Sequence, residues 1–200
     1  MKIIKYCKIK ENRVTVNGEK VLETAEQPGS SKQFKEIYTS LGISYPKFYK
    51  MDMLSKLAFL ASEYLLMDMR DKLSETETAI ILSNRHSTLN VDKKYIESID
   101  DENYFPNPAH FVYTLPNVMI GEISIRNDLK GETLFVQVPS FSGEILKQYL
   151  DSMKFKNVIC GFVEYSDENN FEAMLTFIER DEKNGIMEIS EELDRSYNNF

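Results

Sequence analysis

A serine follows a short apolar segment at the point where many enzymes carry a nucleophile. The stretch GETLFVQVPSFSGEILKQYL, Gly131 to Leu150, predicts a strand over 133–138, a sharp turn and a helix from about 142 to 154. Ser140 lies in the turn, so it could attack an acyl group if a nearby base removed its proton. A serine just before a helix is more often an N-cap, and Ser142 could cap this helix equally well. Both roles for Ser140 stay open here.

Other residues that could do chemistry are few and scattered. The two histidines are His86, which follows a predicted strand over 76–85, and His110, in a loop rich in Pro and Asn. No Gly-x-Ser-x-Gly elbow surrounds Ser140, although a small hydrolase that pairs Ser140 with His86 is an alternative. Phosphate loops, dinucleotide fingerprints and metal-ligand spacings are not found in the sequence, so we expect neither a cofactor nor a metal.

The composition predicts one packed domain over residues 1–200. The chain is 42% hydrophobic and 12% aromatic, and its formal net charge of -8 disfavours nucleic acid and anionic membranes as partners. The N-terminus has no signal-peptide pattern, and no apolar run approaches the ~20 residues of a membrane span. Cys7 and Cys160 lie in apolar runs without CxxC spacing, which indicates buried thiols in a reducing compartment. We therefore expect a cytoplasmic protein that binds no membrane.

The predicted elements alternate between strands and helices. Asn17-Gly18 between Val-rich arms predicts a β-hairpin, and Asp52 is the expected N-cap of a helix that is apolar nearly all round and therefore buried. Further strands are expected over 76–85, 133–138, 157–165 and 171–180, and further helices over 33–41 and, with Pro116 in the first turn, over 114–129. This order predicts an α/β fold with a mixed sheet of about five strands and helices on both faces.

One long stretch, FPNPAHFVYTLPNVMIGEISIRNDLKGETLFV, resembles the N-terminal half of β-ketoacyl synthases of the thiolase-like fold. In that family an Asn/Ser-Pro-x-x-Phe loop leads into a Pro-Asn-containing helix, a Gly, and Arg-x-x-x-x-Gly before the central strand. The matching positions here are Asn107, Pro108, Phe111, Pro116, Asn117, Gly121, Arg126 and Gly131. Upstream, KFYKMDMLSKLAFLASEYLL resembles the family's buried helix, and AIILSNRHSTLN resembles its second strand and the following loop.

The resemblance implies that Ser140 occupies the position of the family's nucleophilic cysteine. A serine hydroxyl has a far higher pKa than a thiol and needs a base to attack. The family's His or Asn partners come from a C-terminal half of about equal size, which these residues do not include, and neither His86 nor His110 matches them. We therefore expect no catalytic residue. A stand-alone acyltransferase or thioesterase that uses Ser140 is the alternative.

The helix after Ser140 supports this expectation. In a full ketosynthase this helix lies between the two halves and carries small and apolar residues. Here its polar residues fall on one face and its apolar residues on the other, which indicates a face built for water. The polar residues are Glu144, Lys147, Gln148 and Asp151; the apolar ones are Ile145, Leu146, Tyr149, Leu150 and Met153.

The resemblance also implies a partner. It places the strand TLFVQV at a sheet edge, and in the family the equivalent strands pair across a dimer. The expected function is a non-catalytic, chain-length-factor-like subunit of a fatty acid or polyketide pathway, such as aryl polyene or flexirubin synthesis, that pairs with a full-length β-ketoacyl synthase. Pairing with itself as a homodimeric binding module is a further possibility. Contacts with the partner or the acyl chain are expected at Phe111, Asn117, Gly121, Phe135 and Phe141.

Overall fold

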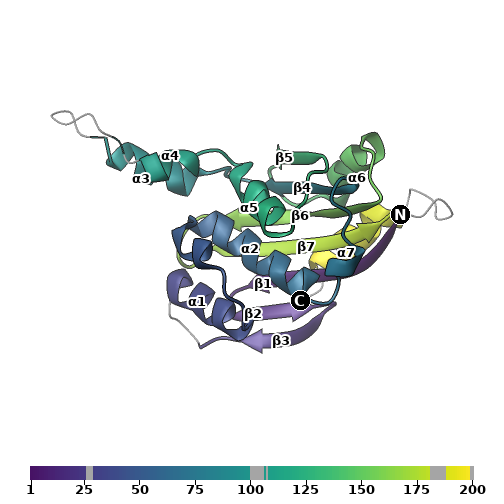
Figure 1. The fold of residues 1–200 in the computed structure, drawn as a ribbon, viewed down its shortest axis with the longest axis horizontal. Coiled ribbons are helices and arrows are strands. Elements are labelled where there is room, and N and C mark those ends of the chain that lie inside the picture. Colours follow the sequence, from purple (N-terminus) through teal and green to yellow (C-terminus); the bar gives the residue numbers. More distant parts are fainter. Residues whose placement is uncertain (26–28, 100–105, 107, 181–187, 199–200) are drawn as a thin grey trace.

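A seven-stranded mixed sheet forms the centre of the computed structural model, which describes residues 1–25, 29–99, 106, 108–180 and 188–198 (Figure 1). The strand order is β3-β2-β1-β7-β6-β4-β5. The strands are β1 Lys2–Lys10, β2 Arg13–Val16, β3 Glu19–Glu23, β4 Thr78–Asn84, β5 Thr133–Gln137, β6 Asn157–Tyr165 and β7 Phe171–Glu179. β4 runs parallel to both β5 and β6, and the other neighbouring pairs are antiparallel.

The sheet has seven strands where about five were expected. The series β1, β7, β6, β4 and β5 forms the covered body of the sheet, and the β2–β3 hairpin adds two strands beyond β1. Asn17 and Gly18 turn this hairpin with φ angles of 52° and 82°, the left-handed conformation that an Asn-Gly turn favours. The hairpin itself is therefore confirmed, and the difference lies in how far it extends the sheet.

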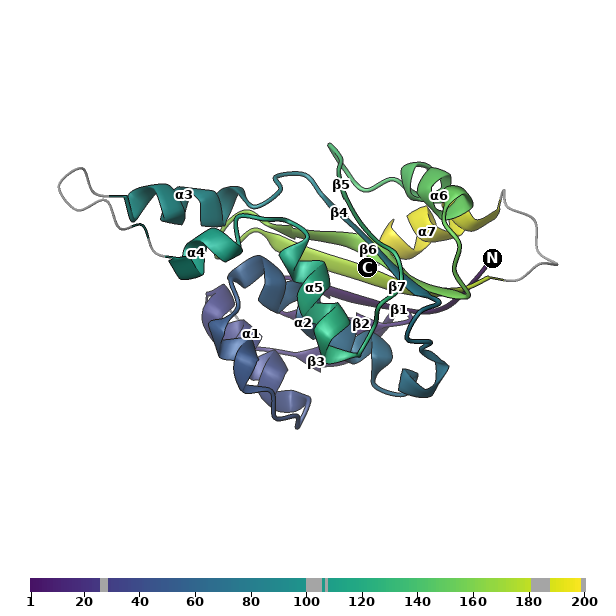
Figure 2. The ribbon, with the colours of Figure 1, turned by 45° about the horizontal axis from the view of Figure 1, so that its top comes forward.

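Helices cover both faces of the sheet, as expected (Figure 2). On one face, α1, α2 and α5 pack against a core that includes Phe59, Leu65, Ile80 and Leu175. On the opposite face, α6 and α7 pack against Ala79, Ile81, Val158 and Ile178. The bounds are α1 Ser30–Ser40, η1 Pro46–Lys50, α2 Met53–Leu66, η2 Arg70–Lys72, α3 Leu89–Glu97, α4 Pro108–Val112, α5 Val118–Arg126, α6 Gly143–Ser152 and α7 Glu188–Asn198.

The buried helix predicted after Asp52 is α2. The Asp52 carboxylate accepts hydrogen bonds from the backbone N–H groups of Leu54 (3.0 Å) and Ser55 (3.1 Å), which confirms it as the N-cap. Every residue from Leu54 to Leu66 except Lys56 is buried. This helix packs against α1, α5 and the sheet, so it needs apolar side chains on almost all of its surface.

The helix predicted over 114–129 begins later than expected. α5 starts at Val118 with Asn117 at its N-cap, so Pro116 precedes the helix instead of lying in its first turn. The residue before a proline is disfavoured in the α conformation, which separates Leu115 from the helix. The Thr114 N–H also continues the turn of α4 by donating to the Phe111 carbonyl at 3.1 Å.

α3 and α4 form an arm that projects from the body of the molecule (Figures 1 and 2). Several of its large apolar side chains are exposed, as is Leu115 in the connection to α5: Leu89, Ile96, Phe111, Val112 and Leu115. None of the helices in the described part of the chain is both long enough and apolar enough to cross a membrane.

Candidate functional site

The turn that carries Ser140 joins the end of β5 to α6. One backbone bond and one side-chain bond hold this turn: the Val138 N–H donates to the Asn84 carbonyl (2.8 Å), and Arg85 Nε donates to the Pro139 carbonyl (2.6 Å). Ser140 itself is exposed, and within the described ranges no hydrogen bond reaches its hydroxyl. Ser140 thus lies in the turn between β5 and α6, as predicted, and no base is bonded to it in this part of the chain.

Other groups occupy the N-terminus of α6. Ser142 is the N-cap, and its hydroxyl accepts from the Ile145 N–H at 3.3 Å. The Gly143 N–H donates to Oδ1 of Asp194 at 2.8 Å, and Asp194 belongs to α7. A helix N-terminus stabilises a thiolate or oxyanion through its free N–H groups and dipole. Here the Asp194 carboxylate already lies at the N-terminus of α6 as the anion. This arrangement disfavours a second negative charge at Ser140.

A cysteine substituted at position 140 measures how the Asp194 carboxylate affects a negative charge at this turn. We expect Ser140→Cys to give a thiol with a pKa no lower than the ordinary value of about 8.5. Adding Asp194→Asn should lower that pKa by about one unit, because the amide keeps the acceptor and removes the charge. The pH dependence of iodoacetamide alkylation measures both values. Burial raises the pKa of Cys7 and of Cys160 to about 12, so neither native thiol interferes.

The control is Asp151→Asn, which removes one carboxylate at the other end of α6 and should leave the introduced thiol unchanged. A pKa far below the ordinary value in Ser140→Cys, insensitive to Asp194→Asn, would show that the α6 terminus still activates a nucleophile.

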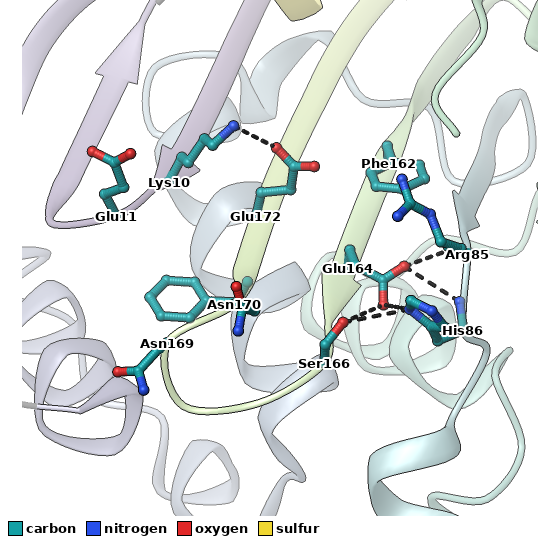
Figure 3. A pocket seen from close by; sticks show the side chains of 11 residues that line it. Lys10, Glu11, Arg85, His86, Phe162, Glu164, Ser166, Asn169, Asn170 and Glu172 are labelled. Carbon is teal, nitrogen blue, oxygen red and sulfur yellow. Dashed lines mark hydrogen bonds and ion pairs between the residues drawn. The ribbon is translucent and has the colours of Figure 1, made fainter. Parts of the chain in front are cut away.

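A polar pocket of about 420 Å3 lies where β1, β4 and β6 end and β7 begins (Figure 3). The carboxyl ends of strands are where open α/β sheets bind ligands. Glu164 Oε2 accepts from the backbone N–H groups of Arg85 (2.7 Å) and His86 (3.3 Å). Glu172 accepts from the Tyr197 hydroxyl at 2.8 Å and pairs with Lys10 at 3.3 Å. Both carboxylates therefore have partners within the chain, and Glu164 fixes the loop after β4.

His86 meets a carboxylate and a hydroxyl in this pocket, but not as a catalytic triad would arrange them. Glu164 Oε1 lies 3.0 Å from His86 Nδ1, and Ser166 Oγ lies 3.4 Å from the same nitrogen. A triad needs the acid and the nucleophile on different ring nitrogens, so that one orients the ring while the other gives up its proton. The histidine is also bonded to Glu164 and Ser166 instead of Ser140.

Two residues of the family-like pattern have structural roles. Arg126 donates from Nε and Nη2 to the two carboxylate oxygens of Glu63, at 3.0 and 3.1 Å, and Glu63 is buried. A Cβ at Gly131 would lie 2.2 Å from the Thr78 carbonyl oxygen, so only glycine fits where the chain enters β5. Asn107 lies outside the described residues.

The residues expected to contact a partner are not all equally available. Phe111 and Asn117 are exposed, and a Cβ at Gly121 would meet nothing within 4 Å, so this face of α5 is open. Phe135 lies on the edge strand and packs partly against the core. Phe141 is half-buried, because its ring stacks on Tyr197 of α7 with a centroid distance of 4.4 Å.

The glycines of α5 and α6 offer a matched pair of substitutions. We expect Gly121→Ala to keep or raise the stability of the fold by about 0.5 to 1 kcal/mol, because alanine favours a helix and finds open space. Gly143→Ala should lower it by about 1 to 3 kcal/mol, because its Cβ would lie 2.2 Å from the Ser190 carbonyl oxygen and push α7 away. Urea unfolding measures both. An equal loss for the two variants would contradict this account of the helix surfaces.

The C-terminal helix α7 has a role that was not predicted from the sequence. α7 buries Ile189 and Leu193 against Leu146 and Leu150 of α6. The signal was present, since Ile189, Leu193 and Tyr197 recur every four residues in an otherwise acidic tail. Of the polar face predicted for α6, Glu144, Gln148 and Asp151 are exposed, whereas Lys147 is half-buried and pairs with Asp151. α6 is thus covered by α7 on one side and open to water on the other.

No protein-family model and no curated protein matches this sequence. Among solved structures, the fold is similar to a chain of a ketosynthase (ApeO) in complex with its chain length factor (ApeC) from Xenorhabdus doucetiae. The identity is 14% and the TM-score 0.58, over 90% of this chain and 79% of that one. A chain of the complex AntDE:AntF, a type II polyketide synthase acyl-carrier protein with its ketosynthase, is also similar, with 13% identity and a TM-score of 0.51 over 89% of this chain and 62% of that one.

These likenesses establish the fold class. The chain has the thiolase-like fold of ketosynthases, as the resemblance implied, with a mixed sheet and helices on both faces. Because 90% of this chain corresponds to 79% of the first matched chain, that chain is only modestly longer than this one. The second matched chain is longer, and this protein spans about 62% of it.

Proposed function

We propose that the protein is a non-catalytic, chain-length-factor-like subunit that pairs with a complete β-ketoacyl synthase. The observation that carries this proposal is the α6 terminus, where the Asp194 carboxylate accepts from the Gly143 N–H. The resemblance implies that Ser140, just before this terminus, replaces the family's nucleophile. The fold supports it as well, since one similar solved structure is a ketosynthase with its chain length factor. The pathway would be of the polyketide or fatty acid type, with aryl polyene or flexirubin pigments as the products. The protein would act in the cytoplasm.

The proposed docking surface is the edge strand β5. It pairs with β4 on one side only, and its burial pattern leaves Thr133 and Gln137 exposed. A strand edge is an open row of N–H and C=O groups that a second strand can complete. In the resembling family the equivalent strands pair across a dimer. The open face of α5 around Gly121 and the exposed Phe111 of the arm are the proposed neighbouring contacts.

α7 supports docking through β5 instead of through α6. Tyr197 stacks on Phe141, and Asp194 bonds the first residue of α6. In a full ketosynthase the corresponding helix is covered by the second half. A partner or second half on this side of α6 would have to displace α7, whereas β5 is already open.

The test is co-expression with a candidate β-ketoacyl synthase from the same organism. We expect the two chains to co-purify and the product length of the synthase to change when this chain is present. Purification of the synthase alone, with the same products, would count against the pairing. A homodimer of this chain that excludes the synthase would favour the alternative of a binding module that pairs with itself.

The second candidate is a stand-alone acyltransferase or thioesterase that uses Ser140. The exposure of Ser140 favours it, because a substrate could reach the hydroxyl. It requires that a fluorophosphonate or thioester probe label the protein and that Ser140→Ala abolish the labelling. Because no base is bonded to Ser140 in the described part of the chain, we expect no labelling above that of Ser140→Ala.

A further inference from the structure

A second pocket, of about 320 Å3, lies away from Ser140, between the N-terminal end of α2 and the arm. Its walls come from η1 and α2 on one side and from α3, α4 and the residue after α4 on the other. Apolar side chains form much of the lining: Met51, Met53, Val91, Ala109 and the ring of Tyr113. Met51 and Val91 are buried, so the apolar surface reaches into the molecule.

Positive charge gathers around this apolar lining, although the protein as a whole is acidic. Lys50, Lys56 and Lys94 all line the pocket. Burial lowers the pKa of Lys56 most; the charge of Asp52 raises it, and the charge of Lys94 lowers it, so the two ammonium groups repel each other. Two like charges drawn together cost free energy unless an anion lies between them.

Two further polar groups face the pocket. Asp52 is its one carboxylate, but that group already accepts from the Leu54 and Ser55 N–H groups as the cap of α2. Nδ1 of His110 is buried and has no hydrogen-bond partner among the described residues. A buried polar atom without a partner calls for an explanation, and a bound molecule supplies one. The balance of three lysines against one occupied carboxylate favours an anion.

We propose that this pocket binds an organic anion that carries a carboxylate on a short apolar chain. The carboxylate pairs with Lys56 and Lys94 and accepts a hydrogen bond from Nδ1–H of His110, while the chain lies against Met51 and Val91. The volume is in the range of small-ligand sites, and an inorganic anion would leave the apolar walls uncovered. The site does not depend on the proposed pairing, so it can be tested on this chain alone.

The test is calorimetric titration with octanoate, acetate and 1-octanol. We expect saturable binding of octanoate, at least about ten-fold tighter than acetate, which lacks the chain, and than octanol, which lacks the charge. Equal binding of acetate and octanoate would overturn the role of the apolar walls. Equal binding of octanol would overturn the role of the lysines, and the absence of saturable octanoate binding would overturn the site.

Lysine variants place the binding in this pocket. Lys94→Gln changes an exposed side chain, so the fold is kept, and it should weaken octanoate binding by at least about three-fold. Adding Lys56→Gln should raise the loss to about ten-fold or more. The matched control is Lys93→Gln. It also removes one positive charge from α3, at the residue just before Lys94, but Lys93 does not line the pocket. Equal binding by Lys94→Gln and Lys93→Gln would contradict the proposal.

Discussion

Gln137→Pro is expected to weaken pairing with a β-ketoacyl synthase by at least about ten-fold while the chain itself stays folded. The Ile80 N–H donates to the Glu132 carbonyl, and the Val138 N–H donates to the Asn84 carbonyl. Since successive N–H groups of a strand alternate in direction, those of residues 134 and 136 also face β4, and those of 135 and 137 face outward. Proline at 137 therefore removes a donor from the open edge and none from the β4–β5 pair.

The control for this variant is Gln137→Ala. The Gln137 side chain donates from Nε2 to the Arg85 carbonyl at 2.9 Å, and both substitutions lose that bond. Only proline also removes the outward N–H, so the alanine variant should pair nearly as well as the unchanged protein. Surface plasmon resonance against the immobilised synthase measures both affinities. Equal affinities for the two variants would show that β5 does not contribute backbone hydrogen bonds to the pair.

Arg126→Met is expected to lower the free energy of unfolding by about 2 to 4 kcal/mol, the largest stability effect we predict. Glu63 is 2% exposed and lies between Arg126, at 3.0 and 3.1 Å, and Arg70, at 2.7 Å. Removing Arg126 leaves Arg70 as the remaining ionic partner of the Glu63 carboxylate among the described residues. Burying a poorly compensated charge costs more than the lost contact itself.

Urea unfolding tests this prediction through two comparisons. Combining Arg126→Met with Glu63→Met should recover part of the loss, because the buried charge is then gone. Lys130→Met breaks an exposed pair with Glu75 and should change nothing measurable. If Arg126→Met were as harmless as Lys130→Met, the Arg of the family-like pattern would not be a structural residue of this fold.

Much of the fold follows from local signals in the sequence. Asn17-Gly18 has one favoured turn, Asp52 caps α2 through its own backbone neighbours, and the apolar run in β4 is buried along its full length. The edge position of β5 came from the resemblance, and the strand order confirms it. These features depend on residues close in sequence or on a pattern that spans most of the chain.

The rest depends on contacts between distant segments, which periodicity does not reveal. Asp194 reaches the N–H of Gly143 from 51 positions away, and Tyr197 covers Phe141. The late start of α5 depends on the turn that α4 continues through Thr114. The pocket between α2 and the arm also depends on distant segments, since Lys56 belongs to α2 and Lys94 to α3.

The mass of the complex with a candidate β-ketoacyl synthase tests the central claim most directly. Native mass spectrometry of the two purified chains, mixed at equal concentration, should give a heterodimer of one copy of each. Gln137→Pro should strongly reduce that species, and Gln137→Ala should retain it. A spectrum that contains only the separate synthase and this chain alone, or a heterodimer that Gln137→Pro leaves intact, would contradict the proposed subunit that docks through β5.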